Sequence, residues 1–240
     1  MADILAPVAS PTSLEKMAYE AIKEAILSFR LKPGETLVEA DLARQLSISK
    51  TPVRDALSRL EKEGFITKIP YKGYYVSEVS RETIIEIFEI RAVLEGLACR
   101  LAAPLLTAED LAALNALLEQ HATAAAAGNI ALASQLNRRF HDTIIQKSAN
   151  RWLADTLAHL DEHLRRYRTL SNFQSGRLEK SVDEHRAILN ALASKALVEA
   201  EAAARQHLHS VSADLAAQDF KELVQLASSQ AVIPNRSYPE

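Results

Sequence analysis

The chain has 240 residues, of which 48% are hydrophobic, 25% are charged and 5% are aromatic, and its formal net charge is −3. This composition is that of a soluble protein with one large domain or two smaller ones. Low counts of glycine (6) and proline (8) favour helices and argue against an all-β sandwich or barrel. The single cysteine, Cys99, excludes a disulfide framework and any CxxC metal or redox motif.

The sequence contains no sign of a membrane or secretory protein. No stretch approaches 18 uninterrupted apolar residues, the length that a membrane-spanning helix needs. The segment 1–12 lacks the basic region and the apolar core of a signal peptide. We therefore expect a cytoplasmic protein that does not contact a membrane.

The first 79 residues predict three helices. Apolar residues recur at helical spacing over 14–30, and Pro33-Gly34 stops that helix. A short apolar helix follows and ends in a serine-bearing turn at 47–49. A third helix then has Pro52 in its first turn, where no backbone donor is needed, and Gly64 at its C-terminal end.

A β-hairpin is expected directly after the third helix. The runs 65–69 and 74–77 are rich in β-branched and aromatic residues, and the turn 70–73 joins them. The order helix, helix, helix, hairpin is that of a helix-turn-helix with a β-wing.

The rest of the chain predicts an all-helical bundle. Thr107 is expected to cap a helix, Ser181 to Glu184 to form a capping box, and 172–180 to be a loop. The fold class is thus mostly α, with a winged helix-turn-helix domain at 10–79, a helical bundle at 80–228 and a loose tail at 229–240. Helices are expected at 80–103, 107–127, 129–148, 150–169, 181–194 and 196–226.

Charge is distributed unevenly along the chain. The segment from Arg44 to Lys72 holds seven basic and three acidic residues, whereas the part from Arg81 onward holds 17 basic and 20 acidic ones. A basic segment in an otherwise mildly acidic chain is typical of a polyanion site confined to one module.

The third helix carries Lys50, Thr51 and Arg54 near its N-terminus, the end that enters the major groove in helix-turn-helix proteins. Arg can pair with guanine O6 and N7, and Thr can contact a thymine methyl group or a phosphate. Lys68 and Lys72 flank the wing and are placed to neutralise phosphates. The alternative is a three-helix hairpin whose basic residues are merely solvated.

These residues resemble the GntR family of bacterial transcription regulators over about 14–79. The resemblance rests on Pro33-Gly34, LARQL at 42–46, SKTPVRDAL at 49–57, Glu63-Gly64-Phe65 and Gly73. It implies a double-stranded DNA operator, with contacts from Ser49, Lys50, Thr51, Arg54 and the wing residues Lys72 and Gly73. Many members have Arg where this chain has Lys50.

The second domain resembles the all-helical, ligand-binding half of the FadR-type subfamily, the FCD-like domain. The motifs are RAVLE at 91–95, Phe140-His141, NRWL at 150–153, EHRAI at 184–188 and His207-Leu208. The resemblance implies a homodimer that senses a small effector.

Three histidines are candidate metal ligands. Asn137 and His141 lie four residues apart and so share a helical face, and His185 and His207 come from two later helices that can face one cavity. The alternative is that each histidine packs singly. The resemblance implies a divalent ion (Zn, Ni, Fe or Mn) held by three histidines and a helical Asp, which here is Asn137.

Open coordination positions on such an ion would take a carboxylate, so an organic acid effector is expected. Arg91, in an otherwise apolar helix, is the candidate partner of a second anionic group. His159 and His163, also four residues apart, do not match the subfamily pattern and are expected to be exposed or at the pocket edge.

The sequence thus predicts a dimeric regulator that binds a pseudo-palindromic operator and responds to a small organic acid, most commonly by release of repression. Two other classes stay open: a metal-dependent hydrolase using the same histidines, and a helical interaction protein without an effector. The hydrolase lacks an HExxH motif and leaves the winged module unexplained.

Overall fold

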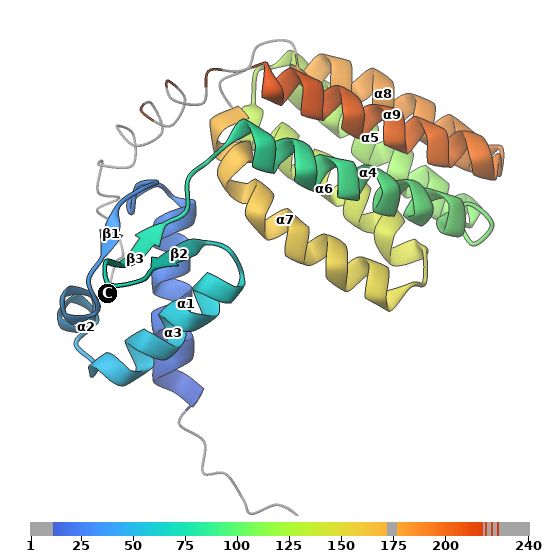
Figure 1. The fold of residues 1–240 in the computed structure, drawn as a ribbon. Helices are drawn as coiled ribbons and strands as arrows, with labels where there is room; N and C mark the ends of the chain where they lie inside the picture. The colour runs from blue at the N-terminus through green and yellow to red at the C-terminus, as the bar shows by residue number, and fades with distance from the viewer. Residues whose placement is uncertain (1–11, 172–176, 218, 220–221, 223–224, 226–240) are drawn as a thin grey trace, which may run out of the picture. The chain divides into compact units, whose positions relative to one another are not determined.

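The computed structural model describes residues 12–171 and 177–217, together with 219, 222 and 225. Within these residues, 12–79 form one compact unit and 80–217 form a second one (Figure 1). The sequence-based domain limits stay a prediction, and the expected tail at 229–240 lies outside the described residues.

The first unit contains the expected helices and hairpin. Its helices are α1 (Thr12–Leu27), α2 (Glu39–Leu46) and α3 (Lys50–Lys62), and its strands are β1 (Thr36–Leu37), β2 (Ile66–Ile69) and β3 (Gly73–Val76). The strands form an antiparallel sheet in the order β1-β3-β2. The prediction omitted β1, because a strand of two residues is too short to show an alternating pattern.

The core of the first unit forms because α3 presents one apolar face. Val53, Ala56, Leu57 and Leu60 recur at three- and four-residue spacing, and all four are fully buried. Their burial against α1 and the sheet leaves the opposite face of α3 in solvent. Gly64 follows with a positive φ of 78° and ends the helix as expected.

The second unit is all-helical in the part of the chain that the structure describes. Its helices pack lengthwise against one another, with α4 along α9 and α5 beside α6 and α8 (Figure 1). They are α4 (Arg81–Ala102), α5 (Ala108–Ala126), α6 (Ile130–Lys147), α7 (Arg151–Ser171), α8 (Arg177–Ala193) and α9 (Leu197–Ala216).

The start of α8 contradicts the sequence prediction. The helix begins at Arg177, so 177–180 are helical rather than loop, and Ser181 lies inside the helix instead of capping it. Helix-forming residues and the packing of Leu178 on the core explain the earlier start. The capping box of this unit is at Thr107 and Asp110, where Thr107 was expected to be the N-cap.

The end of α9 also differs from the prediction. The helix ends at Ala216 rather than near 226, and most of the residues expected to continue it lie outside the described residues.

A glycine sets the distance between α4 and α9. A Cβ atom at Gly96 would lie 2.8 Å from Cγ of Arg205 and 3.1 Å from Cγ of Glu201, both on α9. The missing side chain therefore lets the two helices approach closely, which brings Glu95 of α4 near the histidine-bearing face of α9.

No helix among the described residues is long and apolar enough to cross a membrane.

Candidate functional site

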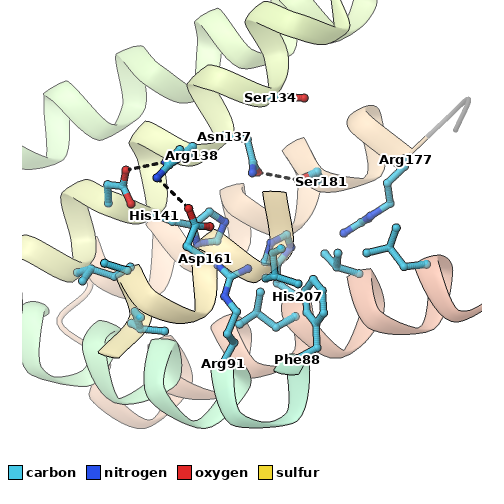
Figure 2. Close-up of a pocket in the computed structure, with 18 of the residues that line it drawn as sticks. Phe88, Arg91, Ser134, Asn137, Arg138, His141, Asp161, Arg177, Ser181 and His207 are labelled. Atoms are coloured by element: carbon cyan, nitrogen blue, oxygen red, sulfur yellow. Dashed lines mark hydrogen bonds and ion pairs between the residues drawn. The ribbon is translucent and has the colours of Figure 1, made fainter. Parts of the chain in front are cut away.

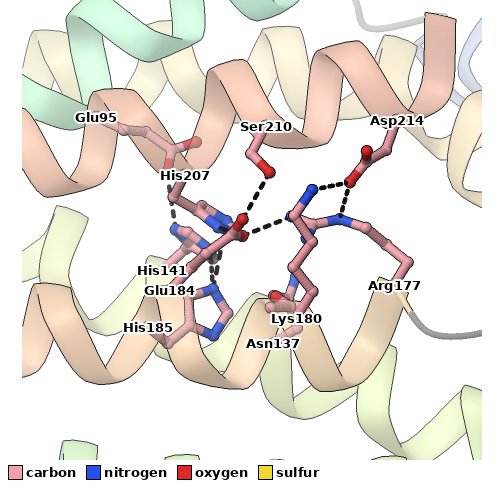
Figure 3. Close-up of polar contacts among 11 residues, drawn as sticks. Glu95, Asn137, His141, Arg177, Lys180, Glu184, His185, His207, Ser210 and Asp214 are labelled. Atoms are coloured by element: carbon pink, nitrogen blue, oxygen red, sulfur yellow. Dashed lines mark hydrogen bonds and ion pairs between the residues drawn. The ribbon is translucent and has the colours of Figure 1, made fainter. Parts of the chain in front are cut away.

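The three candidate histidines converge inside the second unit. His141 comes from α6, His185 from α8 and His207 from α9 (Figure 3). Nε2 of His185 lies 3.0 Å from Nε2 of His141 and 3.3 Å from Nε2 of His207. His185 and His207 are buried, and only 11% of the His141 side chain is exposed. Sequence reasoning placed these three residues together, and the structure does so.

Two carboxylates, the buried Glu95 and the half-buried Glu184, orient two of the imidazoles. Oε2 of Glu95 lies 2.8 Å from Nδ1 of His141, and Oε2 of Glu184 lies 2.7 Å from Nδ1 of His207. Since an ionised carboxylate can only accept a hydrogen bond, Nδ1 of both histidines donates and carries the proton. In the neutral imidazoles, both Nε2 atoms therefore turn a free lone pair toward His185.

Each carboxylate is also paired with an arginine. Glu95 accepts from Nη2 of Arg91. Glu184 accepts from Nη2 of Arg177 at 2.7 Å and from the Ser210 hydroxyl at 2.6 Å (Figure 3). The site thus contains two chains of the same kind, arginine to glutamate to histidine.

These contacts keep both carboxylates ionised. Burial raises the pKa of Glu95, but Arg91 and His141 outweigh burial and hold that pKa well below its ordinary value. Burial likewise raises the pKa of Glu184, yet hydrogen bonds from His207, Arg177 and Ser210 lower it to about 2.

Two of the histidines, His185 and His207, have lowered pKa values that favour the neutral form. Burial lowers the pKa of His207 to about 4, although the hydrogen bond to Glu184 acts in the opposite direction. Burial, together with the neighbouring histidines, lowers the pKa of His185 well below its ordinary value. Neutral imidazoles are the form that binds metal.

The donor set fits a transition metal ion. The ligand atoms of the three histidines all lie within 4.8 Å of one another. Zinc–nitrogen bonds of about 2.0–2.1 Å in a tetrahedron imply nitrogen–nitrogen distances of about 3.3 Å, close to the two that are found. A neutral His185 has one N–H and can donate it to only one of its two neighbours. A bound cation, in contrast, can accept the lone pairs of all three Nε2 atoms. The residues present can therefore hold a metal ion.

A cavity of about 360 Å³ opens beside the histidines (Figure 2). Its lining includes His141 and His207 but not His185, which lies behind them and is fully buried. Asn137 lines the same cavity one turn before His141, and its Oδ1 lies 3.5 Å from the Ser181 hydroxyl, which donates to it. A cavity of this size suits a small organic molecule.

The cavity has cationic residues on its wall. Arg91 and Arg177 both line it, with 12% of each side chain exposed. Nε of Arg91 and Nη1 of Arg177 are buried and have no hydrogen-bond partner among the described residues. Phe88, one turn before Arg91, also lines the cavity, and its ring centroid lies 5.6 Å from the guanidinium carbon of Arg91.

His159 and His163 are separate from this site. They contact each other on α7, with ring centroids 5.6 Å apart, and neither belongs to the metal-ligand cluster found among the described residues. His159 is exposed, as expected.

The second candidate site is the N-terminal end of α3 in the first unit. Ser49 precedes the helix as its N-cap, although its side chain makes no capping hydrogen bond. Lys50, Thr51 and Arg54 are exposed on the first turns. The structure therefore presents all four predicted DNA-contacting residues of this helix on the surface of the first unit.

The wing presents a second set of polar residues. Lys72 is exposed at the turn between β2 and β3, and Gly73 adopts a φ of 103°, a conformation that favours glycine. Tyr71, which sequence reasoning did not single out, is fully exposed at the same turn. Its position inside the expected turn 70–73 could have indicated this exposure.

Comparison with known proteins identifies both units. The model of bacterial regulatory proteins of the gntR family matches residues 14–76, and the FCD domain model matches residues 86–210, more than half of the chain. The chain belongs to the GntR family. Its C-terminal FCD domain places it in the FadR-type subfamily, a group of transcription regulators rather than of enzymes. The metal-dependent hydrolase is thereby excluded.

Individual relatives of this GntR-family chain are regulators as well. The Nta operon transcriptional regulator of Aminobacter aminovorans is 35% identical over 70% of this chain and 79% of its own length. The HTH-type transcriptional regulator YdhC of Bacillus subtilis is 30% identical over 82% of this chain and 87% of its own length. The solved structure of Escherichia coli McbR/YncC covers 85% of this chain and 97% of its own, with a TM-score of 0.65 and 29% identity.

Sequence reasoning missed Glu95, Glu184 and Arg177 as parts of the site of this regulator. Glu95 lies four residues after Arg91, and this spacing could have predicted an ion pair on one helical face. Arg177 and Glu184 were not linked, because 177–180 were expected to be a loop.

Proposed function

We propose that this GntR-family regulator binds a pseudo-palindromic operator as a homodimer and responds to a small organic acid through a metal-containing pocket in its FCD domain. The observation that carries the proposal is the convergence of three imidazoles on one point at the wall of a cavity.

The metal ion would be held by His141, His185 and His207, with Asn137 as an oxygen ligand. Zn, Ni, Fe and Mn all accept imidazole nitrogen. Asn137 brings no negative charge, but its position beside the cavity, one turn from His141, supports its role. A bound divalent ion would supply positive charge and coordination positions for the carboxylate of an effector.

The effector would be an organic acid with a second anionic group. Arg91 lines the cavity, carries a permanent charge and has one buried nitrogen without a partner. It already pairs with Glu95, so it is fixed in place before an effector arrives and loses little rotamer freedom on binding.

DNA binding would use Ser49, Lys50, Thr51 and Arg54 of α3 together with Lys72 and Gly73 of the wing. Their exposure on the first unit and the match to the gntR family model support this assignment. A regulator of bacterial DNA would act in the cytoplasm.

The dimer is supported by an apolar stripe on α4. Ile90, Val93 and Leu97 follow one helical face and are 52%, 50% and 36% exposed, and Trp152 of the neighbouring α7 is 75% exposed. An exposed apolar stripe of this kind is typical of a protein interface. A two-fold dimer would place one such stripe against its copy and give two reading heads for two half-sites.

Repression released by the effector is the proposed mode of action. The HTH-type transcriptional repressor RspR of Escherichia coli is 26% identical over 85% of this chain and 90% of its own length, and its name states that RspR is a repressor.

The test is metal analysis of the purified chain combined with a metabolite thermal-shift screen, on wild type and on His185→Ala. We expect about one divalent ion per wild-type chain, and loss of both metal and effector response in the variant. DNA binding without effector should persist in the variant, because the metal ligands all lie in the second unit. His159→Ala is the matched control and should behave like wild type.

Two results would contradict the proposal. Wild-type protein that retains no ion after incubation with Zn²⁺ would remove the metal site. A full effector response in extensively chelated protein would separate the effector from the metal. Absence of both metal and any thermal shift would indicate a regulator whose helical domain only mediates protein contacts.

A further inference from the structure

Two of the three clustered histidines have a partner for the ring nitrogen that faces away from the cluster, and the third has none among the residues that the structure describes. Glu95 holds Nδ1 of His141 and Glu184 holds Nδ1 of His207, whereas Nδ1 of His185 is buried without a hydrogen-bond partner. A buried polar atom without a partner destabilises the fold and is rare in folded proteins. His185 is fully buried, so bulk water cannot form the missing hydrogen bond to its Nδ1 atom.

A second unpaired imidazole lies beside it. His121 of α5 is 1% exposed, and neither of its ring nitrogens has a hydrogen-bond partner in the described part of the chain. Its ring centroid is 5.5 Å from that of His185, and the ring planes differ by 40°. Three buried nitrogens without partners therefore belong to two adjacent rings on α5 and α8.

A hydrogen bond between the two rings would give partners to two of these nitrogen atoms. A neutral imidazole offers one donor and one acceptor, so His121 can accept a hydrogen bond from Nδ1–H of His185. The ring separation allows this contact after a rotation of the His121 ring or through one ordered water, which needs polar partners of this kind. Phe140 stacks on the His185 ring, with centroids 4.7 Å apart, and covers another side of it.

We propose that His121 is the positioning residue of His185: it accepts a hydrogen bond from Nδ1–H of His185, directly or through one water, and so turns the Nε2 lone pair of His185 toward the metal. This inference rests on the proposed metal site. Partners that hold the non-ligating nitrogen of a metal-bound histidine fix its tautomer and contribute about 10- to 100-fold in metal affinity. His121 would do for His185 what Glu95 and Glu184 do for the other two ligands, without adding a third negative charge.

The test compares His121→Phe and His121→Gln in the full chain. Phe keeps an aromatic ring in the core and removes the acceptor, whereas Gln keeps an acceptor. We expect His121→Phe to weaken Zn²⁺ affinity about 10- to 100-fold in a chelator competition. The metal-free variant should melt at or above the wild-type temperature, because a buried unpaired polar group is replaced by an apolar one. His121→Gln should retain most of the affinity, and His159→Phe, at an exposed histidine, should retain all of it.

A spectroscopic measurement reads the hydrogen bond itself. In the Zn²⁺-loaded wild type, ¹⁵N–¹H spectra of the histidine rings should show a protected Nδ1–H of His185, and that proton should exchange faster or shift in His121→Phe. Equal Zn²⁺ affinity and an unchanged His185 signal in His121→Phe would overturn the inference while leaving the metal site in place. Wild-type protein that binds no Zn²⁺ would overturn the proposed metal site, and this inference with it.

Discussion

The guanidinium of Arg54 on α3 is held by the carboxylate of Glu39 on α2. Nε and Nη2 of Arg54 lie 3.2 Å and 3.1 Å from the same oxygen, Oε2 of Glu39. The Arg54 side chain is 63% exposed, so solvent screens this pair and it contributes little to stability. The proposed base-reading residue is therefore positioned by a weak partner that DNA can displace.

Replacing Glu39 with Gln should strengthen DNA binding. The substitution releases Arg54 and removes a negative charge close to the phosphate backbone, so we expect affinity to rise up to about fivefold, the equivalent of about 1 kcal/mol. The rise should appear on operator and on unrelated DNA. Arg54→Ala should instead lose about 1–3 kcal/mol on the operator and relax the preference at one base pair. Fluorescence anisotropy at fixed salt measures both.

The control for this experiment is Asp41→Asn. Asp41 also lies on α2 and is paired with Arg44 at 2.9 Å, so its replacement changes the net charge equally without releasing Arg54. In the Arg54→Ala background Glu39→Gln should have a much smaller effect, since the two residues are coupled. An Arg54→Ala variant with unchanged operator affinity would show that the recognition helix is assigned wrongly.

Lys72 on the wing should contribute charge without sequence information. Lys72→Gln is expected to weaken binding to all DNA sequences similarly and to reduce the slope of log K against log salt by about one. Titrations at several salt concentrations give the slope. Lys195→Gln, at an exposed lysine of the second unit, should leave the slope unchanged. A loss confined to the operator would instead make Lys72 a base-reading residue.

Glu63 should make the first unit sensitive to acid. Burial raises the pKa of this carboxyl, but hydrogen bonds from Tyr19, Lys23 and Arg59 outweigh burial and lower the pKa below its ordinary value of 4.5. A lowered pKa stabilises the fold fully above the unfolded value and loses this contribution as pH falls through the folded value. Amide hydrogen exchange in α1 and α3 of the full chain should therefore accelerate as pH falls below about 4.5, after correction for intrinsic rates.

Glu63→Gln tests the same network. Lys23 has a side chain only 9% exposed and would lose the charge of Glu63, so we expect a cost of about 1.5–3 kcal/mol near neutral pH. The variant should also show a smaller change in exchange between neutral and acidic pH. An acid response in α1 and α3 as large as that of wild type would mean that another group causes it.

The proposed dimer depends on the apolar stripe of α4. Wild type should scatter light as a particle of about twice the chain mass of 26.4 kDa at micromolar concentration. Val93→Asp places a charge on the stripe and should shift the protein toward the monomer, with weaker operator binding. Val198→Asp, at an exposed valine at the start of α9, is the matched control and should stay dimeric. A wild-type mass of one chain, with and without DNA, would contradict the dimer.

The sequence alone predicted much of this regulator because its signals are local. The spacing of Val53, Ala56 and Leu57, the turn at Gly73 and the capping residue Thr107 each act within a few positions of the chain. The TPVRDAL string and the order of His141, His185 and His207 are likewise visible without coordinates. Local patterns were least informative at chain segments with weak periodicity, which is why β1 was missed and the start of α8 was placed too late.

The tertiary structure decided what surrounds the histidines. Glu95 lies 46 residues before His141, and Glu184 lies 23 residues before His207. No local pattern in the sequence links residues so far apart, so only the packing of the helices brings each carboxylate to its histidine. The same holds for His121 beside His185 and for Glu39 beside Arg54. Contacts between different helices depend on how closely the helices pack, as at Gly96, and no local periodicity encodes that distance.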